Sequence, residues 1–133
     1  MEKAFIARMI GGGSKNLLLQ VQGQCETNFV EGWKPVFNMK QLKHPANYLR
    51  LDAVHYAISE GLELQIAWSN SDEIEIICPL AGRGKLDFDQ ISGVHSFLER
   101  PLEEIVVRVL GEAKNGFPSF LLMIDLSLHQ GAL

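Results

Sequence analysis

Residues 47–89 read NYLRLDAVHYAISEGLELQIAWSNSDEIEIICPLAGRGKLDFD, and this stretch decides the fold. It contains three runs in which apolar and polar residues alternate, separated by short polar turns: 47–59, 62–68 and 73–80. A shorter run over 85–89 closes the block. A period of two is typical of strands that bury one face. We therefore predict an antiparallel meander in which 62–68 is the hairpin partner of 47–59, and whose apolar face needs a second layer.

The first of these strands changes the parity of its apolar positions. Leu49 and Leu51 are odd-numbered, whereas Val54 and Ile58 are even-numbered. A strand cannot move its apolar set to the opposite face without an extra residue. The pattern therefore predicts a β-bulge or a bend near Asp52–Val54.

The rest of the chain also contains β-prone runs. We predict further strands at four places: Ala4–Ile10, Leu17–Val21, Ile105–Val109 and Phe120–Leu128. Glycines 11–13 would turn the first pair into a hairpin. Residues 112–116 end in Asn-Gly, which predicts a second hairpin between the last two strands.

Two stretches depart from this pattern. Gln24–Pro45 has weak periodicity and two prolines, which favours a long loop with one helical turn that folds Trp33 and Phe37 onto the sheet. Residues 90–100 space apolar side chains like one face of a short helix.

These elements together predict the fold class. About eight strands with turn signals roughly ten residues apart are typical of a sandwich or barrel. We predict an all-β protein, a single-domain antiparallel β-sandwich (jelly-roll-like) over residues 1–133, with one long loop and one short helix.

Composition limits the classes of partner. The chain has 133 residues, a net charge of −4, 47% apolar residues and a mean hydropathy of +0.05. Its 12 Lys and Arg residues form no run, so neither nucleic acid nor an anionic membrane is an expected partner. The slightly high hydropathy favours a surface that a partner subunit covers. Leu121 and Met123, on the second face of the last predicted strand, also need cover.

Location and redox state follow from the same sequence. No stretch approaches the roughly 20 apolar residues that span a bilayer. Residues 1–10 carry Glu2, Lys3 and Arg8 and lack a cleavage pattern, so we expect a strand there rather than a signal peptide. Cys25 and Cys78 lie far apart, which favours reduced thiols and a reducing compartment.

Residues capable of chemistry occur in patterns that favour a structural role. Asp87 and Asp89 share one strand face, but no calcium-loop spacing surrounds them. The histidines are not spaced as metal ligands: His44, His55, His95 and His129. Glycines 11–13 precede a strand instead of the helix that a phosphate loop needs. We therefore predict no catalytic residue, no cofactor and no metal, with a hydrolase or a metal-dependent enzyme as a remote alternative.

The residues with the best claim to an interaction surface are Trp33 and Phe37, in the long loop, and Arg83, between two glycines. Arg83 could pair with a carboxylate or phosphate of a partner. Trp68 continues the apolar face of its strand, so we expect it in the core.

Several motifs resemble a known group of proteins. They are Tyr48–Ile58 (YLRLDAVHYAI), Leu62–Trp68 with its terminal aromatic residue, Gly82–Phe88 (GRGKLDF) and the last strand, 120–129. Over residues 47–128 these are similar to small phage virion structural proteins. The resemblance implies a particle component that packs against copies of itself or other virion proteins, in the virion or the host cytoplasm.

Two functions therefore stay open at the level of sequence. The first is a non-enzymatic structural or assembly protein that acts through its sheet faces and the loop 24–45. The second is a β-sandwich module that binds a small ligand or a carbohydrate with Trp33.

Overall fold

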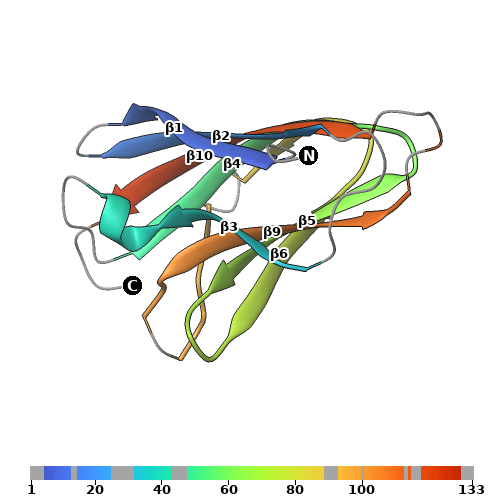
Figure 1. The fold of residues 1–133 in the computed structure, drawn as a ribbon. Coiled ribbons are helices and arrows are strands. Elements are labelled where there is room, and N and C mark those ends of the chain that lie inside the picture. Colours follow the sequence, from blue (N-terminus) through green and yellow to red (C-terminus); the bar gives the residue numbers. More distant parts are fainter. Residues whose placement is uncertain are drawn as a thin grey trace.

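The computed structural model describes residues 5–12, 15–24, 32–42, 48–88, 93–99, 101–112, 114 and 118–129. In these residues the chain forms ten strands and one 3₁₀ turn. The strands make two antiparallel sheets that stack as layers, as Figure 1 shows. The predicted all-β antiparallel sandwich is thereby confirmed. Within the described residues no helix has the length and hydropathy to cross a bilayer.

The first sheet has its long strands in the order β1 (Phe5–Gly12), β2 (Asn16–Gln24), β10 (Ser119–His129), β4 (Tyr48–Ile58) and β7 (Arg83–Asp87). The short β8 (Val94–His95) also pairs with β4. The second sheet has the order β3 (Lys34–Asn38), β9 (Glu104–Gly111), β5 (Leu62–Ser69) and β6 (Ile74–Leu80). The 3₁₀ turn η1 (Met39–Gln41) follows β3. The chain passes back and forth between the layers, as in a jelly roll.

The predicted meander is wrong at two connections, because β4 and β7 lie in the first sheet whereas β5 and β6 lie in the second. The predicted hairpin at 112–116 is wrong for the same reason, since β9 and β10 also belong to different sheets, although residues 115–116 lie outside the described ranges. At the β4–β5 turn, Gly61 has a φ of +94°, and a Cβ there would overlap the carbonyl oxygen of Glu112. The two crossovers thus touch each other. A turn signal in the sequence predicts that the chain reverses direction, but it does not predict which of the two sheets the next strand joins.

The parity change in β4 arises from a β-bulge, as predicted. Asp125 of β10 lies opposite Ala53, and the next residue, Leu126, lies opposite Leu51. Asp52 is the extra residue between them. Leu49 and Leu51 before the bulge and Val54 after it therefore all face the core.

The core fills the space between the sheets, and β10 crosses its centre. The even-numbered residues of β10 from Phe120 to Leu128 are all buried, as their alternation predicted. Trp68 of β5 is also buried, which confirms its expected place. The largest fully buried side chains come from both layers: Trp68, Phe37, Leu19, Leu49, Leu51, Leu64, Ile66, Ile105, Leu122, Ile124 and Leu126.

Part of the predicted long loop is a strand. β3 contains Pro35 and pairs with β9 at the end of the strand order, where a residue without an N–H group is tolerated. The expected helical turn exists as η1, and Asn38 caps it by accepting a hydrogen bond from the Lys40 N–H (2.8 Å). Residues 25–31 and 43–47 lie outside the described ranges. Pro79 is likewise tolerated within β6, opposite Gln65, because β6 is also a terminal strand.

The predicted helix over 90–100 is not present in the part of that stretch that the structure describes, 93–99. Residues 94–95 form β8 instead, and residues 96–99 reach the second sheet. There the N–H of Phe97 donates to Glu75 Oε1 (2.9 Å), and that of Glu99 donates to Glu73 Oε2 (3.3 Å). We call residues 93–99 the strap, because this segment ties one layer to the other. Backbone bonds to the carboxylates of Glu75 in β6 and of Glu73 just before it stabilise an extended segment here.

Truncation of Leu122 tests the position of the core. Leu122 is fully buried, whereas its neighbour Leu121 is 38% exposed on the opposite face of β10. We expect Leu122→Ala to lower the free energy of unfolding by about 2–5 kcal/mol, because it leaves a cavity. Leu121→Ala should cost less than about 1 kcal/mol. Chemical denaturation measures both values. Equal losses would contradict the assignment of Leu122 to the buried face of β10 and of Leu121 to its exposed face.

Substitution of Gly61 tests the contact between the two crossovers. Gly61 and Gly82 both have positive φ (+94° and +74°), but only Gly61 has neighbouring atoms where a Cβ would lie. Gly82→Ala should therefore cost about 1 kcal/mol of backbone strain. Gly61→Ala should cost clearly more, since the backbone of Glu112 must move. Thermal unfolding of the two variants compares them directly, and a Gly61→Ala protein as stable as Gly82→Ala would show that the crossovers do not touch.

Candidate functional site

The three residues predicted for an interaction surface are not brought together. Trp33 precedes β3 in the second sheet, whereas Arg83 is exposed on β7 in the first. Phe37 is only 1% exposed, so its assignment to a surface is wrong. A bulge at Val36 places Phe37 opposite Ile105, on the inner face of β3.

Trp33 is held by a row of polar contacts on the outer face of the second sheet. The guanidinium carbon of Arg108 lies 4.5 Å from the centre of the indole ring. Arg108 Nε donates to Gln65 Oε1 (2.7 Å), and Gln65 Nε2 donates to Glu63 Oε2 (3.2 Å). The cation–π contact covers one face of the ring. Trp33 is therefore a positioned side chain and offers less open ring surface than the sequence suggested.

The other candidate residues also have structural surroundings. Asp87 Oδ2 lies 3.4 Å from Lys85 Nζ, while Asp89, His44 and Cys25 are outside the described ranges. Burial raises the pKa of the Cys78 thiol to about 11, so at neutral pH it is a protonated, weak nucleophile. In the part of the chain that the structure describes, no group of three or more His, Cys, Asp or Glu residues is placed to hold a metal ion.

The structure does assemble one cluster that the sequence did not reveal. Tyr48 lies opposite His129 in the β4–β10 pairing, and their rings stack with centres 4.9 Å apart and planes 11° apart. His95 of β8 meets the Tyr48 ring edge-on at 6.1 Å. Phe97 in the strap lies 4.6 Å from His95. We call these four residues the aromatic strip. The strip runs over the outer face of the first sheet.

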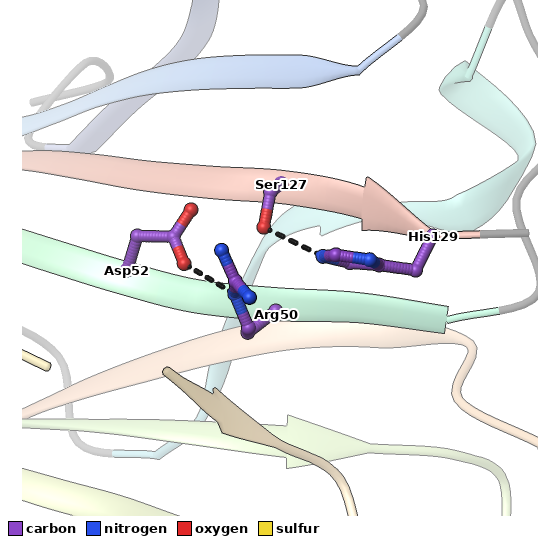
Figure 2. A network of polar contacts seen from close by, with 4 residues as sticks. All are labelled: Arg50, Asp52, Ser127 and His129. Atoms are coloured by element: carbon purple, nitrogen blue, oxygen red, sulfur yellow. Dashed lines mark hydrogen bonds and ion pairs between the residues drawn. The ribbon is translucent and has the colours of Figure 1, made fainter. Parts of the chain in front are cut away.

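Two polar pairs border the aromatic strip, and Figure 2 shows them on the same side of β4 and β10. Arg50 Nε donates to Asp52 Oδ1 at 2.6 Å, and the Ser127 hydroxyl lies 3.0 Å from His129 Nε2. Both pairs are partly buried, with 32% and 19% of the Arg50 and Asp52 side chains exposed. Ser127 is buried, so its hydroxyl orients the imidazole of His129.

Backbone geometry positions Arg50 in this cluster. Arg50 lies opposite Ser127 of β10 on one side and His95 of β8 on the other. Gly93, with a φ of +81°, packs against the aliphatic part of the Arg50 side chain, where a Cβ would overlap it. The bulge residue Asp52 is turned toward the same guanidinium. Only glycine at position 93 leaves room for this arrangement.

Sequence reasoning could not find the aromatic strip, because its members come from positions 48, 95, 97 and 129. Each residue looks isolated along the chain. Only one weak signal was available, the outward parity of Ser127 and His129 in the last strand. The register between β4, β10 and β8 brings the four rings together, and turn and periodicity signals do not encode that register.

Comparisons with known proteins add little to this geometry. The sequence matches no protein-family model, and no curated protein matches it. A cupin superfamily protein from Desulfitobacterium hafniense is 12% identical, with a TM-score of 0.33, over 98% of this chain and 82% of that one. FeII HppE and the hydroxypropylphosphonic acid epoxidase from S. wedmorenis are 9% and 8% identical, each with a TM-score of 0.35. These two matches cover 91% of this chain and 50% of the other, so this chain spans half their length. Likenesses this distant carry no argument about the site.

Replacement of Asp52 tests the energetic role of the Arg50 pair. Asp52→Asn keeps the size of the side chain but removes the charge that Arg50 faces at 2.6 Å. We expect the free energy of unfolding to fall by about 1 kcal/mol, because the pair is partly shielded from solvent. Asp87→Asn is the matched control, since the Lys85–Asp87 pair is 47% exposed on both sides and should change stability by at most about 0.5 kcal/mol. Urea unfolding at low salt measures the free energy of unfolding of both variants. An equal loss in the two would show that the Arg50–Asp52 pair adds no more stability than the exposed Lys85–Asp87 pair.

Proposed function

We propose that this chain is a non-enzymatic assembly protein that docks onto a second copy of itself through the outer face and edge of the second sheet. The observation that carries the proposal is the pair Ile74 and Ile76. Both side chains are 48% exposed and lie on the same face of β6, the last strand in the order of its sheet. Large apolar side chains on a terminal strand favour contact with another protein.

The residues that lie beside Ile76 on the same side of the second sheet are apolar, but only Pro35 among them is exposed. Ile76 lies opposite Ala67 of β5, Ala67 lies opposite Val106 of β9, and Val106 lies opposite Pro35 of β3. Residues that face each other across strands share one side of the sheet. Because Ala67 and Val106 are buried (0% and 4% exposed), the accessible apolar surface is at the β6 edge, where Ile74 and Ile76 lie.

A second copy is the partner that this edge fits best. If β6 pairs antiparallel with β6 of another copy about a two-fold axis near Glu75, Ile74 of each copy meets Ile76 of the other. Such an isologous contact is self-complementary and closes at two subunits. Charged side chains often guard terminal strands, but the carboxylates of Glu73 and Glu75 accept backbone bonds from the strap. These two carboxylates therefore bind the strap and do not cover Ile74 and Ile76.

We further propose a particle as the setting of this assembly. The resemblance to small phage virion structural proteins supports it, as does the slightly positive mean hydropathy of +0.05. Other virion proteins are then the alternative partners, in the virion or the host cytoplasm. Co-purification of the chain with assembled particles, followed by mass spectrometry, tests the setting separately from self-association.

Lysine at position 76 tests the docking edge. We expect Ile76→Lys to weaken self-association about tenfold or more, because it places a charge in the apolar contact. Light scattering across a range of concentrations measures the mass. Ile6→Lys is the matched control, since Ile6 is similarly exposed (41%) but lies on β1 of the other sheet. A wild-type protein that stays strictly monomeric at high concentration, or an equal effect of both lysines, would overturn the proposal.

A further inference from the structure

We propose that the aromatic strip, with Arg50 and Asp52 beside it, is a binding site for a neutral oligosaccharide. Tyr48, His95 and His129 lie on the first sheet, and Phe97 lies in the strap that reaches β6. The docking contact uses other side chains, Ile74 and Ile76. The sequence suggested Trp33 for a carbohydrate, but one face of that ring is covered by Arg108. Phe97, with a side chain that is 74% exposed, offers a more accessible ring.

Phe97 is the central observation. Its side chain is 74% exposed, the largest value among the large apolar side chains of the described residues. An apolar ring on a loose loop would bind weakly, because binding would have to order it. The backbone of Phe97 is instead held by its bond to Glu75 (2.9 Å), two residues after β8 pairs with β4. Phe97 is thus an exposed ring on an ordered segment.

The neighbouring rings extend this surface. His95, Tyr48 and His129 continue from Phe97 across β8, β4 and β10, with neighbouring ring centres 4.6, 6.1 and 4.9 Å apart. A pyranose ring has an apolar face made of C–H groups, which packs on aromatic rings. The planes of neighbouring rings are inclined by 46°, 63° and 11°, so the strip offers ring faces and ring edges in different directions over its length. The strip therefore fits an extended chain better than a single monosaccharide.

The polar groups beside the strip suit sugar hydroxyls. Each hydroxyl both donates and accepts hydrogen bonds, and the planar side chains of Arg and Asp offer paired donors and paired acceptors. The bond between Arg50 and Asp52 uses one of the five guanidinium N–H groups and holds both side chains in place. Two adjacent hydroxyls could bridge this pair without breaking it.

Charge selects a neutral ligand over an ion. Arg50 and Asp52 lie 2.6 Å apart, so their charges compensate each other at the site. An anion would approach Asp52 and a cation would approach Arg50, each at an electrostatic cost. A polyhydroxylated neutral molecule meets neither cost. Each single site would be weak, because the strip lies open on a sheet face.

The test is a titration of the full chain with neutral oligosaccharides, observed by saturation-transfer NMR. The panel contains cello-, malto-, manno- and chito-oligosaccharides. Phe97→Ala should weaken binding about tenfold or more, because it removes the most exposed ring. Phe97→Trp should preserve binding, since it keeps an aromatic face. Arg50→Lys should weaken binding too, because an ammonium lacks the planar paired donors.

The controls separate this site from the docking edge. Ile76→Lys should leave saccharide binding unchanged, and Phe97→Ala should leave the oligomeric mass unchanged, so each proposal can fail alone. Phe97 is exposed, so Phe97→Ala should fold normally, and circular dichroism checks this. Three outcomes overturn the inference: no binding from any member of the panel, binding that survives Phe97→Ala, and binding of glucuronate or inorganic phosphate in preference to neutral sugars.

Discussion

The pairing of β4 with β10 is the contact on which the rest of the structure depends. Along these two strands the inner positions form the centre of the core, and the outer positions hold the stacked Tyr48 and His129. A slip of one residue would exchange the two faces, so that buried leucines would meet water and the rings would enter the core. The bulge at Asp52 keeps both halves of β4 in register with β10. It also turns a carboxylate toward Arg50.

The two outer faces of the sandwich differ in chemistry, and this difference separates the two proposed roles. The second sheet exposes Ile74 and Ile76 on one face of its terminal strand β6. The outer face of the first sheet carries rings and compensated polar pairs. The two roles use different side chains, Ile74 and Ile76 for assembly and the aromatic strip for the saccharide. An oligomer would then display several weak saccharide sites at once, and their combined strength would exceed that of any single site.

The strap connects these two surfaces. Its first residues pair with β4, and its later backbone N–H groups reach Glu75 in β6 and Glu73 just before β6. The same segment therefore orders Phe97 for one role and engages the carboxylates of the strand that serves the other. The helical spacing of the apolar residues in 90–100 predicted a helix instead of this connection. In the structure Val94 and Leu98 pack against the core from an extended segment. Tertiary pairing overrode the local pattern there.

By itself the sequence determined the local elements: the strands of 48–58, 62–69, 74–80 and 119–129, the bulge at Asp52 and the burial of Trp68. Period-two alternation and its interruption are properties of neighbouring residues, so they can be read along the chain. Only the tertiary structure decided that β4 and β5 lie in different layers, and that Tyr48, His95, Phe97 and His129 meet. Sheet membership and register depend on how two apolar faces cover each other, and that is a property of the whole chain.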